Sequence, residues 1–87
     1  MAYKFSILPD ASKQLEALDR QTARRILVKL KWLAEQDEPL RHAVFLHNST
    51  IGDIRFRIGD YRAIAIIDQK KKQIAIAAIG HRREIYR

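Results

Sequence analysis

The stretch DIRFRIGDYRAIAIID, residues 53–68, decides the fold of this 87-residue chain. Apolar residues alternate with arginines up to Ile58, which predicts a strand with one apolar and one basic face. Gly59 and Asp60 then give a tight-turn signal. The remaining Ile- and Ala-rich residues predict a second strand that is buried on both faces. Residues 53–68 therefore predict a β-hairpin.

The residues before this hairpin predict a strand followed by two helices. Residues 3–8 alternate as a short strand, and Pro9 at the start of the next segment favours a helix opening. Asp19 is expected to cap a second helix, whose apolar stripe extends from Ala23 to Leu33. That helix is expected to end near Pro39.

The residues on either side of the hairpin complete an α+β chain. Residues 40–51 predict a loop or an irregular strand, and a turn at 69–72 precedes a mostly apolar strand over 73–80. We therefore predict an N-terminal strand, a two-helix hairpin packed on one sheet face, and a three-stranded antiparallel meander. No linker or second domain is expected, so residues 1–87 are predicted to form a single domain.

Composition limits the class of protein. The chain has no cysteine, so we expect no disulfide and no thiolate metal site. No apolar run approaches the roughly 20 residues of a membrane span, and the first residues lack the order of a signal peptide. These features fit a cytoplasmic protein without a membrane partner.

Positive charge is concentrated in the C-terminal portion. Residues 55–87 hold nine basic and three acidic residues, a net charge of +6, out of +7 for the whole chain. Such a field favours polyanions, and the forked guanidinium of arginine suits bidentate contacts with phosphate. The alternative is that the charge serves solubility.

Five arginines are expected to share one surface. Alternation places Arg55 and Arg57 on the same side of their strand, and Arg62 begins the neighbouring strand. Arg82 and Arg83 follow the last strand. Converging guanidinium groups repel each other unless an anion is bound between them. The alternative is local pairing with the nearby acids Asp53, Asp60 and Glu84.

The end of the chain adds groups that could move a proton. The pKa of the Tyr86 phenol is expected to fall below its ordinary value of about 10, because several arginines surround it. It could then accept a proton from a ribose 2′-hydroxyl, although a role as a core anchor is the alternative. His81 could donate a proton or pair with Glu84. The histidines lack metal-ligand spacing and the glycines are isolated, so neither a metal nor another cofactor is expected.

Two segments, residues 55–62 and 80–87, resemble the RelE/ParE superfamily of bacterial and archaeal toxins, and the second resembles its RelE branch. The resemblance covers the whole chain and implies a RelE-like toxin domain. RelE-branch members cut messenger RNA in the ribosomal A site and are silenced by an antitoxin. By resemblance, the catalytic residues are Arg57, Arg62, Arg82 and Tyr86, and Arg55 is a further RNA contact. From the basic cluster itself, we also expect His81, Arg83 and Arg87 to bind RNA.

The resemblance implies that Arg82 is the general acid. Guanidinium holds its proton too tightly to donate it readily, so protonation by His81 or water is the alternative. The resemblance further implies a ribosome-dependent mRNA endoribonuclease toxin that acts without metal through 2′-hydroxyl attack. It also implies a hetero-oligomeric complex with a RelB-like or other antitoxin. A ParE-type inhibitor of DNA gyrase without nuclease activity is the second hypothesis, and a plain nucleic-acid-binding module is the third.

Overall fold

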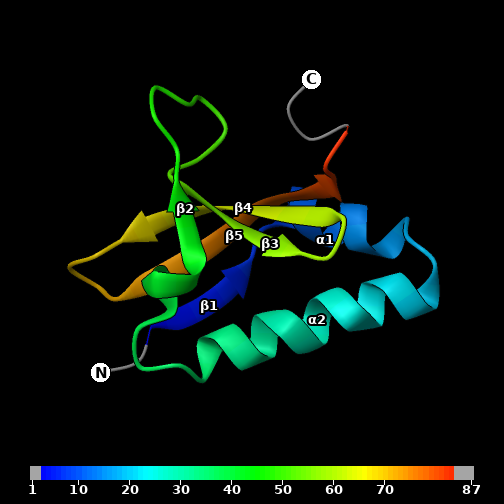
Figure 1. Cartoon of the computed structure of the whole chain (residues 1–87), viewed down its shortest axis with the longest axis horizontal. Coiled ribbons are helices and arrows are strands. Elements are labelled where there is room, and N and C mark those ends of the chain that lie inside the picture. Colours follow the sequence, from blue (N-terminus) through cyan, green and yellow to red (C-terminus); the bar gives the residue numbers. More distant parts are fainter. Residues whose placement is uncertain (1–2, 84–87) are drawn as a thin grey trace.

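The computed structural model describes residues 3–83, which form one five-stranded sheet with two helices packed on it (Figure 1). The strand order is β1-β5-β4-β3-β2. The elements are, in chain order, β1 (Lys4–Ile7), α1 (Pro9–Glu16), α2 (Arg20–Ala34), the 3-10 helix η1 (Pro39–His42), β2 (Ala43–Phe45), β3 (Ile54–Ile58), β4 (Tyr61–Asp68) and β5 (Gln73–His81).

The predicted α+β class and element order are confirmed, and the sheet has one more strand than expected. Within residues 40–51, where a loop or irregular strand was expected, Ala43–Phe45 forms the edge strand β2 and pairs antiparallel with β3. Three residues are too few to show the alternation that marks a strand in sequence. Their conformation depends on backbone bonds to β3, a long-range interaction.

The first strand lies at the opposite edge of the sheet and is parallel to β5. The helices α1 and α2 follow β1 in the chain and cross over one face of the sheet (Figure 1). Because β1 has a neighbour on one side only, its alternating residues are unequally buried. Tyr3 is buried and Phe5 partly buried, whereas Ile7 is 38% exposed.

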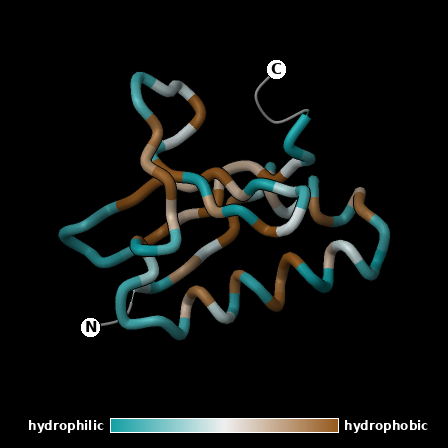
Figure 2. Tube along the Cα trace, in the orientation of Figure 1, coloured by the Kyte–Doolittle hydropathy of each residue, from teal (hydrophilic) through white to brown (hydrophobic). Residues whose placement is uncertain are grey.

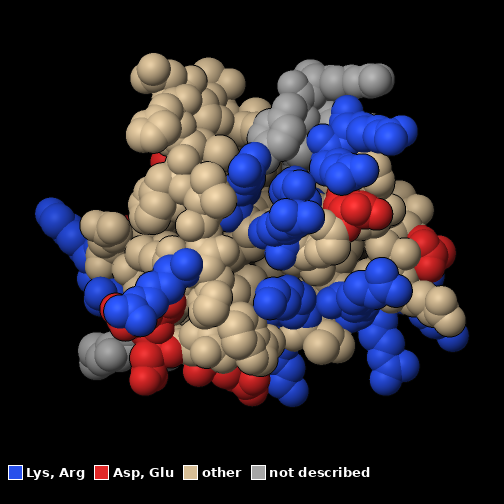
Figure 3. Space-filling model, in the orientation of Figure 1, with Lys and Arg blue, Asp and Glu red and all other residues tan. Residues whose placement is uncertain are grey.

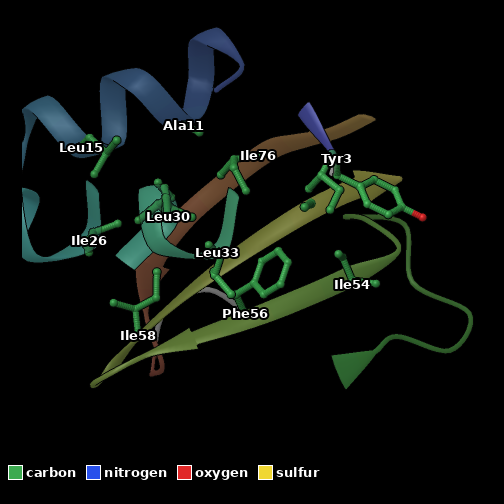
Figure 4. Close-up of a cluster of buried hydrophobic side chains, with 14 residues drawn as sticks. Tyr3, Ala11, Leu15, Ile26, Leu30, Leu33, Ile54, Phe56, Ile58 and Ile76 are labelled. Carbon is green, nitrogen blue, oxygen red and sulfur yellow. The ribbon is translucent and has the colours of Figure 1, made fainter. Parts of the chain in front are cut away.

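The core lies between the helices and the strands. Figure 4 shows Leu15 of α1 and Ile26, Leu30 and Leu33 of α2 facing the sheet side chains. The rings of Phe5 and Phe56 meet with their centroids 5.9 Å apart. In Figure 2 the apolar residues concentrate in the strands, and the β4–β5 turn is hydrophilic. The core thus fixes β3, β4 and β5 against the helical layer.

The middle of β4 is buried on both faces, as expected, but its C-terminal half is not. Ala63 and Ala65 belong to the helix-covered core, and Ile64 is fully buried on the other face. A Cβ at Gly52 would lie 2.5 Å from Ile64 Cγ2, so the β2–β3 loop covers Ile64 closely. Ile66 follows Ala65, the last residue of β4 that is paired with β3, and is 46% exposed. The expectation of burial along the whole strand was therefore wrong at Ile66.

Asp19 caps α2, as the sequence predicted. Its carboxylate accepts hydrogen bonds from the Thr22 backbone N–H at 3.1 Å and from the Thr22 hydroxyl at 2.6 Å. These bonds favour the charged carboxylate and hold the pKa of Asp19 below its ordinary value of 3.8.

Replacing Asp19 with Ala should lower the midpoint of thermal denaturation, because one orphan amide of α2 loses its acceptor. Asp19→Asn should lose less, since an acceptor oxygen remains. The lowered pKa adds stability that is fully present above pH 3.8 and is lost as pH falls through the folded-state pKa. Thermal denaturation of wild type and Asp19→Asn across pH 2–7 checks this prediction. The difference between their denaturation midpoints should shrink toward the lowest pH, and a difference that stays the same would contradict the prediction.

Replacing Gly52 with Ala should lower the free energy of unfolding by about 1–3 kcal/mol, because the added methyl overlaps Ile64 and approaches the Ala65 carbonyl. Urea denaturation measures the change. In an Ile64→Ala background the cost of Gly52→Ala should shrink, since the nearest clashing atom is gone. Equal costs in both backgrounds would show that the loop does not pack on Ile64.

Candidate nucleic-acid site

The sheet register brings Arg57 and Arg62 together on the face that the helices leave uncovered. Arg57 of β3 is the direct cross-strand partner of Arg62 of β4, and Arg62 lies opposite Gly80 of β5. Arg55 points to the same side as Arg57, two residues earlier on β3. Gly80 contributes no side chain beside Arg62.

The turn between β3 and β4 shapes this pair. Gly59 has a φ of +61°, while Asp60 does not have a positive φ, a pattern that matches the type II′ hairpin. Arg62 folds back on the turn, where its Nη1 donates to the carbonyl oxygens of Tyr61 at 3.0 Å and Gly59 at 3.3 Å. Arg62 is therefore half-buried and oriented, whereas Arg57 is exposed.

The end of β5 reaches the same turn. The main-chain N–H of Arg82 donates to the Asp60 carbonyl at 2.8 Å, and Arg82 Nη1 lies 4.0 Å from Asp60 Oδ1. The ring of His81 meets Tyr61 edge to face, with centroids 5.5 Å apart. The Arg83 N–H donates to His81 Nδ1 at 3.2 Å. In neutral His81 the remaining ring proton is consequently on Nε2.

Among the described residues, carboxylates balance only part of the positive charge of these arginines. Among residues 3–83, the ion pairs are Arg82–Asp60 and Arg41–Glu38, so Arg57 and Arg62 have no carboxylate partner there. Asp53 instead accepts a hydrogen bond from the Ile67 N–H. Figure 3 shows basic side chains gathered over the β3–β4 turn, the end of β5 and the adjoining part of α2. Like charges directly opposite in a sheet are unfavourable, and a bound anion relieves this repulsion.

Several sequence-predicted site residues are thus close to one turn. Arg57, Arg62, His81 and Arg82 meet around residues 59–61, and the contact of Arg82 with Asp60 is the local pairing expected as the alternative. Arg55 and Arg83 lie next to this group along β3 and after β5. Tyr86 and Arg87 lie outside the described residues, so their roles stay predictions.

Sequence reasoning missed two contributions to the site. One is the Tyr61 ring against His81, and the other is the side-chain-free position of Gly80 beside Arg62. Both depend on the register between β4 and β5. That register includes an irregularity at Ile64 and Ala65, and no sequence signal locates it.

Two cavities of the described surface lie away from this basic site. A cavity of about 400 Å³ lies between β1 and α2 and is lined mainly by apolar residues, including Phe5, Ile7 and Leu27. A second cavity of about 310 Å³ lies near Tyr3 and Arg41. Within residues 3–83 no helix has the length and apolar character needed to cross a bilayer.

Comparison with known proteins establishes the family. Residues 5–86 match the family described as the ParE toxin of type II toxin-antitoxin systems, parDE. The chain therefore belongs to this family of toxins, within the RelE/ParE superfamily that the sequence resembled. No curated protein matches the sequence.

Solved structures with the same fold are RelE toxins. The toxin in the archaeal RelE–RelB complex of Pyrococcus horikoshii OT3 is 29% identical, with a TM-score of 0.73 over 97% of this chain and 99% of that chain. The Mycobacterium tuberculosis RelBE2 complex contains a chain that is 27% identical, with a TM-score of 0.72 over 93% and 99%. A mutant of E. coli toxin RelE in the free state shares the fold at 18% identity, with a TM-score of 0.69 over 99% and 90%.

Replacing Arg57 and Arg62 together with Gln should weaken binding to a single-stranded RNA. It should also reduce the dependence of log Kd on log salt by about 1 for each phosphate that these two side chains neutralise. Titrations at several salt concentrations measure this slope. The matched control is Lys70→Gln with Lys71→Gln, which removes the same charge at the distant β4–β5 turn. Equal changes in RNA affinity and in salt slope for the two double variants would show that the Arg57–Arg62 pair binds RNA no better than other surface cations.

Proposed function

We propose that this toxin is a ribosome-dependent endoribonuclease that cuts messenger RNA without a metal ion and thereby stops translation. The observation that carries the proposal is the cross-strand pair Arg57–Arg62, which has no carboxylate partner among residues 3–83 and lies beside the end of β5. An enzyme that cleaves a phosphodiester needs concentrated positive charge where negative charge develops in the transition state.

The proposed reaction uses the substrate's own nucleophile. Tyr86 accepts the proton of a ribose 2′-hydroxyl, and the 2′-oxygen attacks phosphorus to form a cyclic phosphate. The bond from phosphorus to the 5′-oxygen breaks, and that oxygen takes up a proton. Arg57, Arg62 and Arg82 stabilise the charge on the phosphoryl oxygens. His81 or water supplies the proton to the leaving oxygen.

The open shape of the site supports dependence on the ribosome. Arg57 is exposed on the sheet face, and the two cavities described above lie elsewhere. A small open site gains little from its own orientation of substrate, whereas mRNA held in the ribosomal A site is already positioned. This target is cytoplasmic, which agrees with the localisation expected from sequence.

An antitoxin partner follows from the family and from the two neighbouring structures, which are toxin-antitoxin complexes. The apolar cavity between β1 and α2, flanked by the half-exposed Leu27 and by Ile7, fits an apolar segment of such a partner. The net charge of +7 favours an acidic one. Toxin and antitoxin would then form a hetero-oligomer that covers part of this surface.

Inhibition of DNA gyrase is the second candidate function, because the matching family is described by the ParE toxin. A gyrase inhibitor of this kind would bind protein and would cut no RNA. The paired Arg57 and Arg62 would then be surface charge with no reacting phosphate to contact.

Primer extension on mRNA in a reconstituted translation system tests the proposal. Wild type should produce cuts with 2′,3′-cyclic or 3′-phosphate ends, and Tyr86→Phe should slow cutting by at least about 100-fold while RNA affinity is kept. Tyr3→Phe, which changes a buried tyrosine near Lys72, is the control and should cut normally.

Other results would refute part or all of this proposal. Full activity of Tyr86→Phe would remove the phenol from the mechanism, and 5′-phosphate with 3′-hydroxyl ends would exclude 2′-oxygen attack. Inhibition of supercoiling by purified gyrase, with no mRNA cuts, would favour the ParE-type function instead.

A further inference from the structure

Asp60, in the turn between β3 and β4, contacts Arg82 in two ways. Its carbonyl oxygen accepts the Arg82 N–H at 2.8 Å, which extends the β4–β5 ladder beyond the Tyr61–His81 pair. Its carboxylate Oδ1 lies 4.0 Å from Arg82 Nη1. Asp60 thus fixes the backbone from which the Arg82 side chain starts and also draws the guanidinium toward the turn.

The carboxylate contact leaves Arg82 able to bind a phosphate. The side chains of Arg82 and Asp60 are 49% and 68% exposed, and exposed ion pairs of this kind add little stability. A guanidinium has five N–H donors, so Arg82 can bind a phosphate oxygen while Asp60 still orients it. At the same time, the negative charge of Asp60 repels an approaching RNA backbone. Asp60 should therefore have two effects: it orients Arg82 and it weakens RNA binding.

The same turn holds the other described groups of the site. Arg62 donates to the carbonyl oxygens of residues 59 and 61, and the ring of Tyr61 packs against His81. Arg62 comes from β4 and His81 from β5, and both contact the three-residue segment 59–61. A change in this segment that leaves the strands intact should consequently alter the geometry of the site rather than the fold.

We infer that Asp60 is a positioning residue, whose carboxylate keeps Arg82 oriented toward the Arg57–Arg62 pair while the Arg82 guanidinium binds the RNA phosphate. This inference rests on the proposed endoribonuclease function. The inference gives the acidic side chain of Asp60 a role in turnover. A residue of this site that served RNA binding alone would be expected to carry a positive charge.

The test compares full-length wild type with Asp60→Asn on programmed ribosomes. Asp60→Asn should lower kcat about tenfold, because Arg82 is less well placed in the transition state. The same variant should bind a 2′-O-methyl RNA about threefold more tightly, because a repelling charge is gone. Asp60→Glu should restore most of kcat. Asp68→Asn removes the same charge at the other end of β4 and should change neither quantity.

A second measurement does not depend on cleavage. Relaxation of the Arg82 Nε–H group by ¹⁵N NMR should show a more mobile guanidinium in Asp60→Asn than in wild type, with equal melting temperatures. Unchanged mobility, or unchanged kcat, would overturn the positioning role. If wild type itself does not cut mRNA, the proposed function fails instead, and the NMR comparison still decides whether Asp60 orders Arg82.

Discussion

The antiparallel pairing of β3 with β4 across the Gly59–Asp60 turn is the constraint on which the rest of the site depends. It places Arg57 directly opposite Arg62 and turns both toward the face without helices. The apolar residues that alternate with these arginines, Ile58 among them, are buried under α1 and α2. Because the strand is buried on one face only, burial of the core and exposure of the arginines are consequences of the same register.

A second constraint acts from β5, whose pairing with β4 brings His81 and Arg82 to the β3–β4 turn. Asp60 and the turn carbonyls take up part of the charge gathered there. This region is basic, whereas the cavity beside β1 is lined mainly by apolar residues of β1 and α2. A polyanion and an apolar protein segment therefore have separate places to bind, which agrees with the proposed RNA target and with an antitoxin partner.

The sequence alone determined the local elements of this protein. Strict alternation in residues 54–58, the Gly59–Asp60 turn and the Asp19 cap each act within a few residues, so their patterns predict the strand, the hairpin and the start of α2. The family resemblance of residues 55–62 and 80–87 also came from the sequence, together with the arginines proposed for the site.

Only the tertiary structure decided what depends on long-range pairing. The short strand β2 exists through its bonds to β3, and Ile66 is exposed where the pairing of β3 with β4 has ended. The contact of Asp60 with Arg82 follows from a β4–β5 register that contains an irregularity at Ile64 and Ala65. Such registers are set by packing between distant segments, which no local pattern records.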